Sequence, residues 1–351
     1  MSASRTNQAA VFDLCPLFLL LVLGTLGIAW VESVLNGVAS PFKASSVSAL
    51  VLSLAIFGVP FAAAAKPASP RDWGNIIAAC LILPIGNMIM PWANDQTIRT
   101  LPNVFDSQVV ALDATLGFQP SFAVGVLFSR YPAFAAICSA MYGAVLFPAA
   151  LVACVEALQG RRRGIGALPT FLVIAGLGFP IYHLLPAIGP AAWFGAAFPF
   201  ETEFSHPPFP RNAIPSLHTA WVVMAVLCTR GMSLPIRLTA GILAAGTIIT
   251  TLGSGAHYLL DLVLAGPFVL LVRALCAVEL PIMARERIGA CLAGVGLLVA
   301  WGLAVRGIVD GTGVPGAVPA AMLATVVLSV WWERRLARGE AGFDAGLTPG
   351  G

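Results

Sequence analysis

The sequence has little charge, and this shortage limits the classes of protein that it can encode. Asp, Glu, Lys and Arg make up 10% of the 351 residues, whereas soluble domains carry about 25%. So few charged side chains cannot coat a water-facing surface, but a lipid bilayer requires an apolar exterior. Because 58% of the residues are hydrophobic, we expect one all-α membrane domain. The net charge of +3 and the lack of a basic stripe argue against a nucleic-acid partner.

The sequence also lacks paired cysteine motifs. Its seven cysteines lie in apolar runs, and no two of them have CxxC spacing. An odd number of cysteines in apolar helices argues against a disulfide framework and against a zinc site. We therefore expect the thiols to act as small apolar side chains.

Long apolar runs, in contrast, are plentiful. A helix that crosses a bilayer needs about 20 mostly apolar residues. The sequence offers ten candidate spans, at residues 14–35, 46–65, 74–93, 132–158, 166–188, 216–230, 238–256, 257–279, 288–309 and 315–333. The first could instead be a signal peptide, because Arg5 precedes it and residues 38–40 resemble a cleavage site. Its length, and Asp13 beside it, favour a retained helix.

Positive charge predicts how these spans are oriented. If the cluster at residues 161–163 is cytoplasmic, alternation places all but five of the 19 Lys and Arg residues on that side. The five are Lys43, Arg99, Arg130, Arg211 and Arg306. We expect both termini to be cytoplasmic, with segments 94–131 and 189–214 forming a cap on the outer face. The Ala-, Gly- and Arg-rich composition favours a bacterial inner membrane protein.

The chain has only four histidines, and the topology predicted from Lys and Arg alone places all of them near the outer face. They are His183, His206, His218 and His257. Ionisable groups in a membrane domain are costly and are therefore candidates for function. For His183 and His206, a purely structural role is an equally good explanation.

One candidate motif runs from Arg211 through Asn212 and Pro215 to His218. Pro215 suits the first turn of a helix, where its missing N–H is not needed. Ser216 and His218 would then lie at the exposed N-terminus of a helix, where free backbone N–H groups and the helix dipole favour an anion. Arg211 could add positive charge there, or it could contact lipid headgroups.

The second candidate motif pairs His257 with Asp261, four residues later. At that spacing the two side chains share one helix face. The carboxylate needs a partner, and the imidazole N–H would be the nearest donor. That contact would fix the tautomer of His257 and leave its other nitrogen free to attack.

Together, the two motifs resemble those of the type-2 phosphatidic acid phosphatase superfamily. They are most similar to the branch that includes fungal inositol phosphorylceramide synthases and their bacterial relatives. The matching stretches are Pro215-Ser216-Leu217-His218, His257-Tyr258-Leu259-Leu260-Asp261 and, more weakly, Tyr182-His183-Leu184-Leu185-Pro186. Asp113 and Tyr142 are further weak matches, although Asp113 is better explained as a cap or turn residue.

The resemblance spans about residues 100–270 and implies a six-helix catalytic core inside a polytopic transmembrane bundle. We place this core in residues 96–280. N-terminal transmembrane helices at 1–95 would precede it, and C-terminal transmembrane helices at 281–338 would follow. We expect the Gly-rich tail at 339–351 to be disordered.

The resemblance also implies roles for the candidate residues. His257 would attack phosphorus and form a phosphohistidine, Asp261 would orient it, and His218 would protonate the leaving oxygen and then activate the incoming alcohol or water. The other candidates would hold the phosphoryl oxygens or the rest of the substrate: Arg211, Asn212, Ser216, Tyr182 and His183. The family uses no metal, and we expect no metal and no other cofactor.

The sequence departs from the phosphatase pattern in having fewer cations. The usual first motif with Lys and Arg is absent, and Thr251 stands where an Arg would precede the nucleophilic histidine by six residues. Since Arg clusters normally hold phosphate dianions, we expect a phosphodiester substrate with a single negative charge.

The main hypothesis is therefore a membrane phosphotransferase. It would move a phospho-headgroup from a phospholipid or polyprenyl-phosphate donor to a lipid or polyol acceptor. A lipid or polyprenyl phosphate phosphatase of the same superfamily is the second hypothesis. The third is a proton-coupled transporter with a His–Asp relay, but relays lie near mid-membrane, whereas these histidines lie at helix ends.

Overall fold

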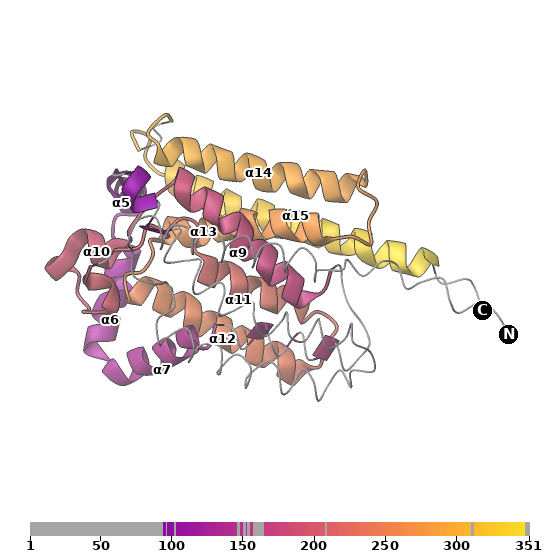
Figure 1. Ribbon diagram of the computed structural model, residues 1–351, viewed down its shortest axis with the longest axis horizontal. Coiled ribbons are helices and arrows are strands. Elements are labelled where there is room, and N and C mark those ends of the chain that lie inside the picture. The colour runs from indigo at the N-terminus through magenta and orange to yellow at the C-terminus, as the bar shows by residue number, and fades with distance from the viewer. Residues whose placement is uncertain are drawn as a thin grey trace, which may run out of the picture.

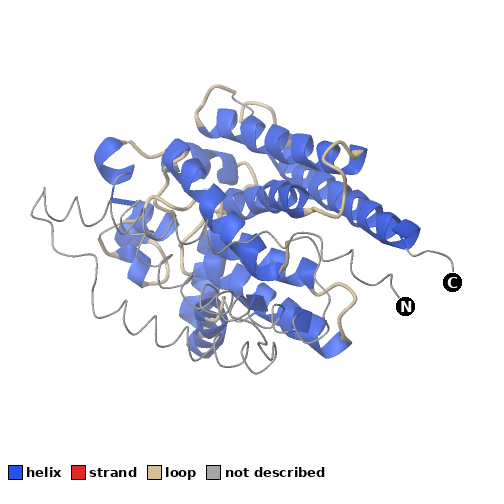
Figure 2. Cartoon of the chain, turned by 45° about the vertical axis from the view of Figure 1, so that its right-hand side comes forward, coloured by secondary structure: helices blue, strands red, loops and turns tan. Residues whose placement is uncertain are grey.

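The computed structural model describes residues 94–95, 97–101, 103–145, 148–149, 152, 155–156, 165–207, 209–309 and 312–347. Within these ranges all regular structure is helical and no strand occurs, which confirms the all-α fold class (Figure 2). The expected N-terminal helices at 1–95 fall almost wholly outside the described residues. So does the question of a signal peptide.

Six helices of the described part run roughly along the long axis of the molecule (Figure 1). They are α9 (Ala167–Leu184), α11 (Leu217–Cys228), α12 (Leu234–Gly253), α13 (Leu259–Cys276), α14 (Arg285–Val305) and α15 (Ala317–Leu347). They match the spans expected from residue 166 onward, except that α15 is longer. Helix α13 is apolar on all sides, and it therefore lies at the centre, packed against α9, α11, α14 and α15.

Shorter helices gather at one end of this bundle, where we expected a cap (Figure 1). They are α5 (Asp106–Ala114), α6 (Pro120–Arg130), α7 (Pro132–Gly143), α10 (Pro190–Phe194), η2 (Gly195–Ala197) and η3 (Glu203–Ser205). Phe122 of α6 packs edge-to-face against Phe194 and Phe198, with ring centroids 4.7 and 5.3 Å apart. This aromatic contact attaches α6 to the segment after α9.

Helices α6 and α7 meet at a sharp bend of 118°. The bend falls at Tyr131, whose backbone is non-helical (φ −129°, ψ 73°) because the following Pro132 disfavours a helical conformation there. Helix α7 ends at Gly143, so it covers only the first part of the span expected at 132–158.

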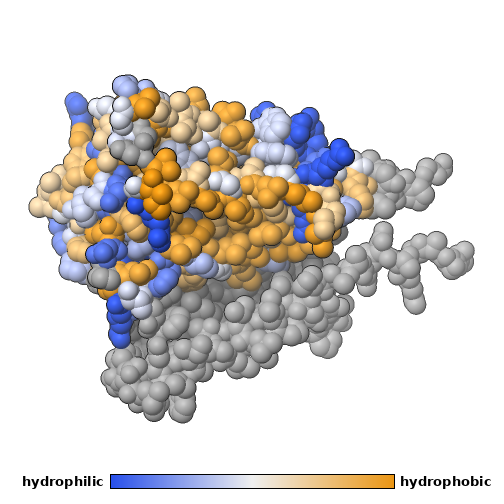
Figure 3. Space-filling view, turned by 90° about the horizontal axis from the view of Figure 1, so that it is seen from above, coloured by the Kyte–Doolittle hydropathy of each residue, from blue (hydrophilic) through white to orange (hydrophobic). Residues whose placement is uncertain are grey.

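Three helices of the described part, α12, α13 and α14, are long and apolar enough to cross a bilayer. The bent pair α6–α7 is a fourth candidate if it counts as one span, and the apolar helices α9 and α11 are shorter. Figure 3 shows apolar residues across the middle of one face and hydrophilic residues toward both ends. This pattern is that of an integral membrane protein.

The C-terminal segment differs from the expected disordered tail. Helix α15 continues without a break through Gly339 to Leu347. Glu340 accepts a hydrogen bond from Arg273 of α13 at 2.7 Å, and Gly339 packs close to the side chain of Glu286. These tertiary contacts hold the helix beyond the point where the Gly-rich composition predicted that it would end.

Candidate active site

Three loops converge at the capped end of the bundle, around residues 186–191, 211–216 and 254–258. Backbone hydrogen bonds join them, from Ala213 N to the Ala187 carbonyl (3.1 Å) and from Ala191 N to the Gly255 carbonyl (2.9 Å). Gly189 allows the closest approach, since a Cβ atom there would lie 2.4 Å from the Ala256 carbonyl oxygen. The two sequence motifs are therefore held within one backbone framework.

Helix α5 anchors this framework with two buried carboxylates. Asp106 accepts hydrogen bonds from the backbone N–H groups of Ile188 (3.0 Å) and Gly189 (2.9 Å) and from the Tyr258 hydroxyl (2.9 Å). Burial raises the pKa of Asp106, and these donors oppose the rise. Sequence reasoning missed this residue, although an acidic side chain in an otherwise apolar segment signals a buried carboxylate that needs donors.

Asp113 caps α13 from α5. Its carboxylate accepts from the backbone N–H groups of Leu259 (2.8 Å) and Leu260 (3.1 Å), which have no partner within their own helix. Burial raises the pKa of Asp113 to about 7, against the effect of these two hydrogen bonds. The cap role expected for Asp113 is confirmed, but the helix that it caps is 146 residues away in the sequence.

His257 lies in the loop before α13, not on the helix as expected. Its Nδ1 is 2.7 Å from the Ala213 carbonyl oxygen and 3.4 Å from Oδ2 of Asp261. A carbonyl oxygen only accepts, so Nδ1 carries the proton and Nε2 holds the free lone pair. Burial lowers the pKa of His257 to about 4, although the hydrogen bond with Ala213 opposes this. The ring is therefore neutral at pH 7.

Asp261 has two structural partners besides its contact with His257. Its Oδ2 accepts from the Tyr258 N–H at 2.8 Å, and its carbonyl accepts from the Ser216 N–H at 3.1 Å. The second bond joins the two sequence motifs directly. Asp261 is completely buried, so solvent screens its interaction with the His257 ring very little.

His218 is the second residue of α11. The helix begins two residues later than Pro215 predicted, because Ser216 is its N-cap and accepts from Thr219 N at 3.3 Å. The His218 ring stacks on Tyr142 with centroids 4.2 Å apart and planes 16° apart. Its Nδ1 is 3.3 Å from the Tyr142 hydroxyl oxygen.

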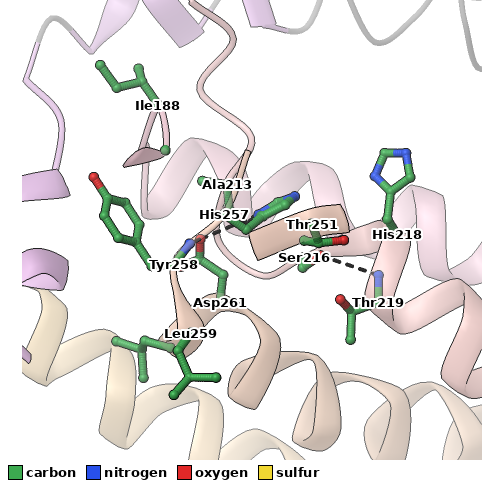
Figure 4. A network of polar contacts seen from close by, with 12 residues as sticks. Ile188, Ala213, Ser216, His218, Thr219, Thr251, His257, Tyr258, Leu259 and Asp261 are labelled. Atoms are coloured by element: carbon green, nitrogen blue, oxygen red, sulfur yellow. Dashed lines mark hydrogen bonds and ion pairs between the residues drawn. The ribbon is translucent and has the colours of Figure 1, made fainter. Parts of the chain in front are cut away.

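The two imidazoles lie in the same region, with Ser216 and Thr251 drawn between them (Figure 4). The His257 ring extends from its loop toward the start of α11, where His218 stands (Figure 4). The structure thus brings together the three residues assigned to catalysis from sequence.

Arg211 contributes a cation near this region. Its Nη1 is buried without a hydrogen-bond partner in the described part of the chain, and Asp106 is the carboxylate that acts on it electrostatically. Burial lowers the pKa of Arg211, against the effect of Asp106. An unpaired guanidinium nitrogen can bind an anionic oxygen. Asn212, the next residue, is partly buried.

The two arginines of segment 94–131 contact groups other than the two imidazoles. Arg99 pairs with Asp95 on the exposed surface, and Arg130 lies over the Tyr131 ring. Thr251, which replaces an expected arginine, hydrogen-bonds through Oγ1 to a carbonyl of its own helix at 2.7 Å.

Two further candidates have other surroundings than expected. Tyr182 is buried in the core, in the same hydrophobic cluster as Leu217 in the first turn of α11. His183 is exposed, and its Nδ1 is 3.3 Å from the Thr97 hydroxyl oxygen. Tyr182 thus packs against α11. His183 contacts Thr97 rather than a residue near His218 or His257. In the described ranges no group of three or more His, Cys, Asp and Glu side chains is arranged to hold a metal ion.

Comparison with known protein families gives a match over part of the chain. Residues 107–276 match the family described as the PAP2 superfamily. The matched segment extends from α5 to the end of α13 and includes His218, His257 and Asp261. No curated protein and no solved structure matches the chain.

Proposed function

We propose that the protein is an enzyme of the PAP2 superfamily, the family that residues 107–276 match, and that it transfers a phospho-headgroup through a phosphohistidine on His257. The observation that carries this proposal is the contact between His257 Nδ1 and the Ala213 carbonyl at 2.7 Å. It holds the proton on Nδ1 and directs the lone pair of Nε2 into the site. A neutral imidazole with this tautomer is a nucleophile at pH 7.

In the first half of the reaction, Nε2 of His257 attacks phosphorus. The N–P bond forms while the bond from phosphorus to the lipid alcohol breaks. The leaving oxygen takes the proton from Nε2 of His218, which acts as general acid. Positive charge develops on the His257 ring during this step, and Asp261, 3.4 Å away, stabilises it.

In the second half, an acceptor alcohol replaces the lipid alcohol. Nε2 of His218 removes the proton from the acceptor hydroxyl while its oxygen attacks phosphorus. The O–P bond forms as the N–P bond to His257 breaks, and both imidazoles return to their starting states. Covalent catalysis of this kind divides one difficult displacement into two easier ones.

The phosphoryl oxygens would bind at the N-terminus of α11. The Ser216 side chain and the free backbone N–H groups of the first turn lie there, and Arg211 offers its unpaired Nη1. A single arginine suits a phosphodiester, which carries one negative charge, better than a phosphate monoester. The proposed donor is therefore a phospholipid or polyprenyl-linked phosphodiester, and the proposed acceptor is a lipid or a polyol.

The distribution of arginines supports an outward-facing site. The end of the bundle opposite the cap carries Arg230, Arg273, Arg285 and Arg287 near the ends of α11, α13 and α14, and Arg334, Arg335 and Arg338 in the second half of α15. Because positive charge is retained in the cytoplasm, this opposite end would be cytoplasmic. The site would then face the outside of a bacterial inner membrane.

The test is direct detection of the covalent intermediate. Purified protein is mixed with phospholipid extracts labelled at phosphorus, and acid-labile label on the protein is measured. Labelling is expected for the wild type and for His206→Gln, a control at an exposed loop histidine that contacts Glu201. His257→Gln should give none. Equal labelling of His257→Gln would exclude this mechanism.

The same preparation separates transfer from hydrolysis. Inositol, glycerol, ceramide and diacylglycerol are added one at a time to the labelled protein. Loss of label from the protein, with formation of a new phosphodiester for at least one alcohol, is expected. Release of inorganic phosphate alone, from a monoester substrate, would contradict the proposed transferase activity.

A further inference from the structure

Tyr142 contacts His218 in two ways at once. The rings stack at 4.2 Å with an angle of 16° between their planes, and the Tyr142 hydroxyl lies 3.3 Å from His218 Nδ1. Trp221 also touches the His218 ring at its edge, but its indole N–H donates to the Phe171 carbonyl. The Tyr142 hydroxyl is thus the polar group that faces Nδ1.

Helix α12 holds Tyr142 in place. The Thr247 hydroxyl donates to the carbonyl of Met141 at 3.3 Å, which fixes the end of α7 beside α12. Gly246 allows this approach, since a Cβ atom there would lie 2.1 Å from the Met141 sulfur. The Tyr142 ring also meets the Phe204 ring edge-on, with centroids 6.5 Å apart. The ring is therefore packed on more than one side and is not a free surface tyrosine.

The two catalytic histidines have different partners at Nδ1. His257 faces a carbonyl, which accepts only and therefore keeps one tautomer. His218 faces a hydroxyl, which can either donate or accept by rotating. Nδ1 of His218 thus keeps a hydrogen-bond partner whether the ring is neutral or protonated. This matches a residue that must first give and then take a proton at Nε2.

We propose that Tyr142 is the positioning residue of His218: its ring fixes the imidazole plane with Nε2 facing the phosphoryl group, and its hydroxyl holds Nδ1 in every proton state. This inference rests on the proposed function, because it assigns Tyr142 to the proton-transfer half of that mechanism. Tyr142 acts through His218 and does not touch the reacting atoms.

The test compares two esters that differ only in their need for a proton. Dioctyl phosphate loses an alkoxide, which must be protonated, whereas octyl 4-nitrophenyl phosphate loses a nitrophenolate, which leaves without a proton. Both are labelled at phosphorus, and formation of the phosphohistidine is followed in a single turnover by rapid quench. Tyr142→Phe removes the hydroxyl and keeps the ring, and Tyr142→Leu removes both.

Labelling by dioctyl phosphate should slow about tenfold in Tyr142→Phe and about a hundredfold in Tyr142→Leu, a part of the ~10²–10⁴-fold that a general acid supplies. Labelling by the nitrophenyl ester should change less than about twofold in Tyr142→Phe, because that step needs no acid. Phe204→Leu, which removes a contact of Tyr142 but none of His218, should affect both esters equally and weakly.

An equal loss with both esters in Tyr142→Phe would show that Tyr142 is merely structural. No loss with either would show that His218 needs no help from it. Both results would leave the proposed function intact, since the wild type still labels. Absence of label on the wild type with both esters would instead overturn the proposed function, and this inference with it.

Discussion

The two ends of the helix bundle differ in the groups that pair with their carboxylates. At the capped end, Asp106 and Asp113 accept hydrogen bonds from backbone N–H groups of distant loops. At the opposite end, Arg230 donates to both carboxylate oxygens of Glu333, and Arg273 donates to Glu340 at 2.7 Å. One end thus pairs carboxylates with backbone, and the other pairs carboxylates with arginine.

This difference distinguishes the candidate active site at the capped end from ion pairs that stabilise the fold at the opposite end. Backbone donors satisfy the carboxylates of α5 and hold the loops, while the Arg211 Nη1 has no hydrogen-bond partner among the described residues and His257 is bonded through Nδ1. Arg230 and Arg273 are paired with the carboxylates of Glu333 and Glu340, so these two arginines keep little capacity to bind another anion. A buried polar atom without a hydrogen-bond partner, such as the Arg211 Nη1, is typical of a functional site.

The largest change is expected for Asp261→Asn, which removes the charge beside His257 and keeps a similar shape. Turnover should fall about a hundredfold, less than the ~10⁴-fold loss for the buried aspartate of a serine-protease triad. The loss is smaller because the Ala213 carbonyl still fixes the tautomer. Steady-state kinetics with the labelled phospholipid measures this. A turnover equal to that of the wild type would show that the carboxylate only caps α13.

A smaller effect on turnover is expected for Asp106→Ala, which leaves two backbone N–H groups and the Tyr258 hydroxyl without an acceptor. Turnover should fall about tenfold because the Tyr258 loop beside His257 loosens, and the free energy of unfolding should fall by about 3 kcal/mol. Thermal unfolding in detergent and the turnover per folded molecule together measure both changes.

Glu333→Gln is the matched change at the opposite end. It weakens the pair with Arg230, which is 36% exposed, so the expected loss of stability is about 2 kcal/mol, below the ~3–5 kcal/mol of a fully buried pair. Turnover per folded molecule should stay unchanged. If Glu333→Gln instead lowered turnover as much as Asp106→Ala, the functional contrast between the two ends would be wrong.

The smallest effect near neutral pH is expected from titration of His257. Because burial lowers its pKa to about 4, kcat/KM should stay level from pH 7 to about 5.5 and fall only as the ring is protonated near the lowered value. The free energy of unfolding should also fall as the pH is lowered. The unfolded histidine titrates near 6.5 and binds more protons below that value, so stability is lost as pH falls from there toward 4. A fall in kcat/KM centred near pH 6.5 would show that His257 is not buried as described.

Much of the candidate site was predictable from sequence, because its residues are rare in an apolar chain. Only four histidines occur, and the two that lie close together are those with a flanking Ser216 or Asp261. Asp106 and the Ala213 carbonyl were not predictable. The partners of Asp106 lie about 80 and 150 residues away, and every residue carries a carbonyl, so neither leaves a local pattern.

The amino-acid sequence by itself determined that the chain is helical and membrane-embedded, since apolar runs of this length have no other stable solution in lipid. It also determined which side chains can perform chemistry. Only the tertiary structure decided that α5 anchors the site, that His257 lies outside its helix, and that α15 continues past Gly339. Each of these depends on hydrogen bonds or ion pairs between segments far apart in the chain, and local propensity carries no information about such contacts.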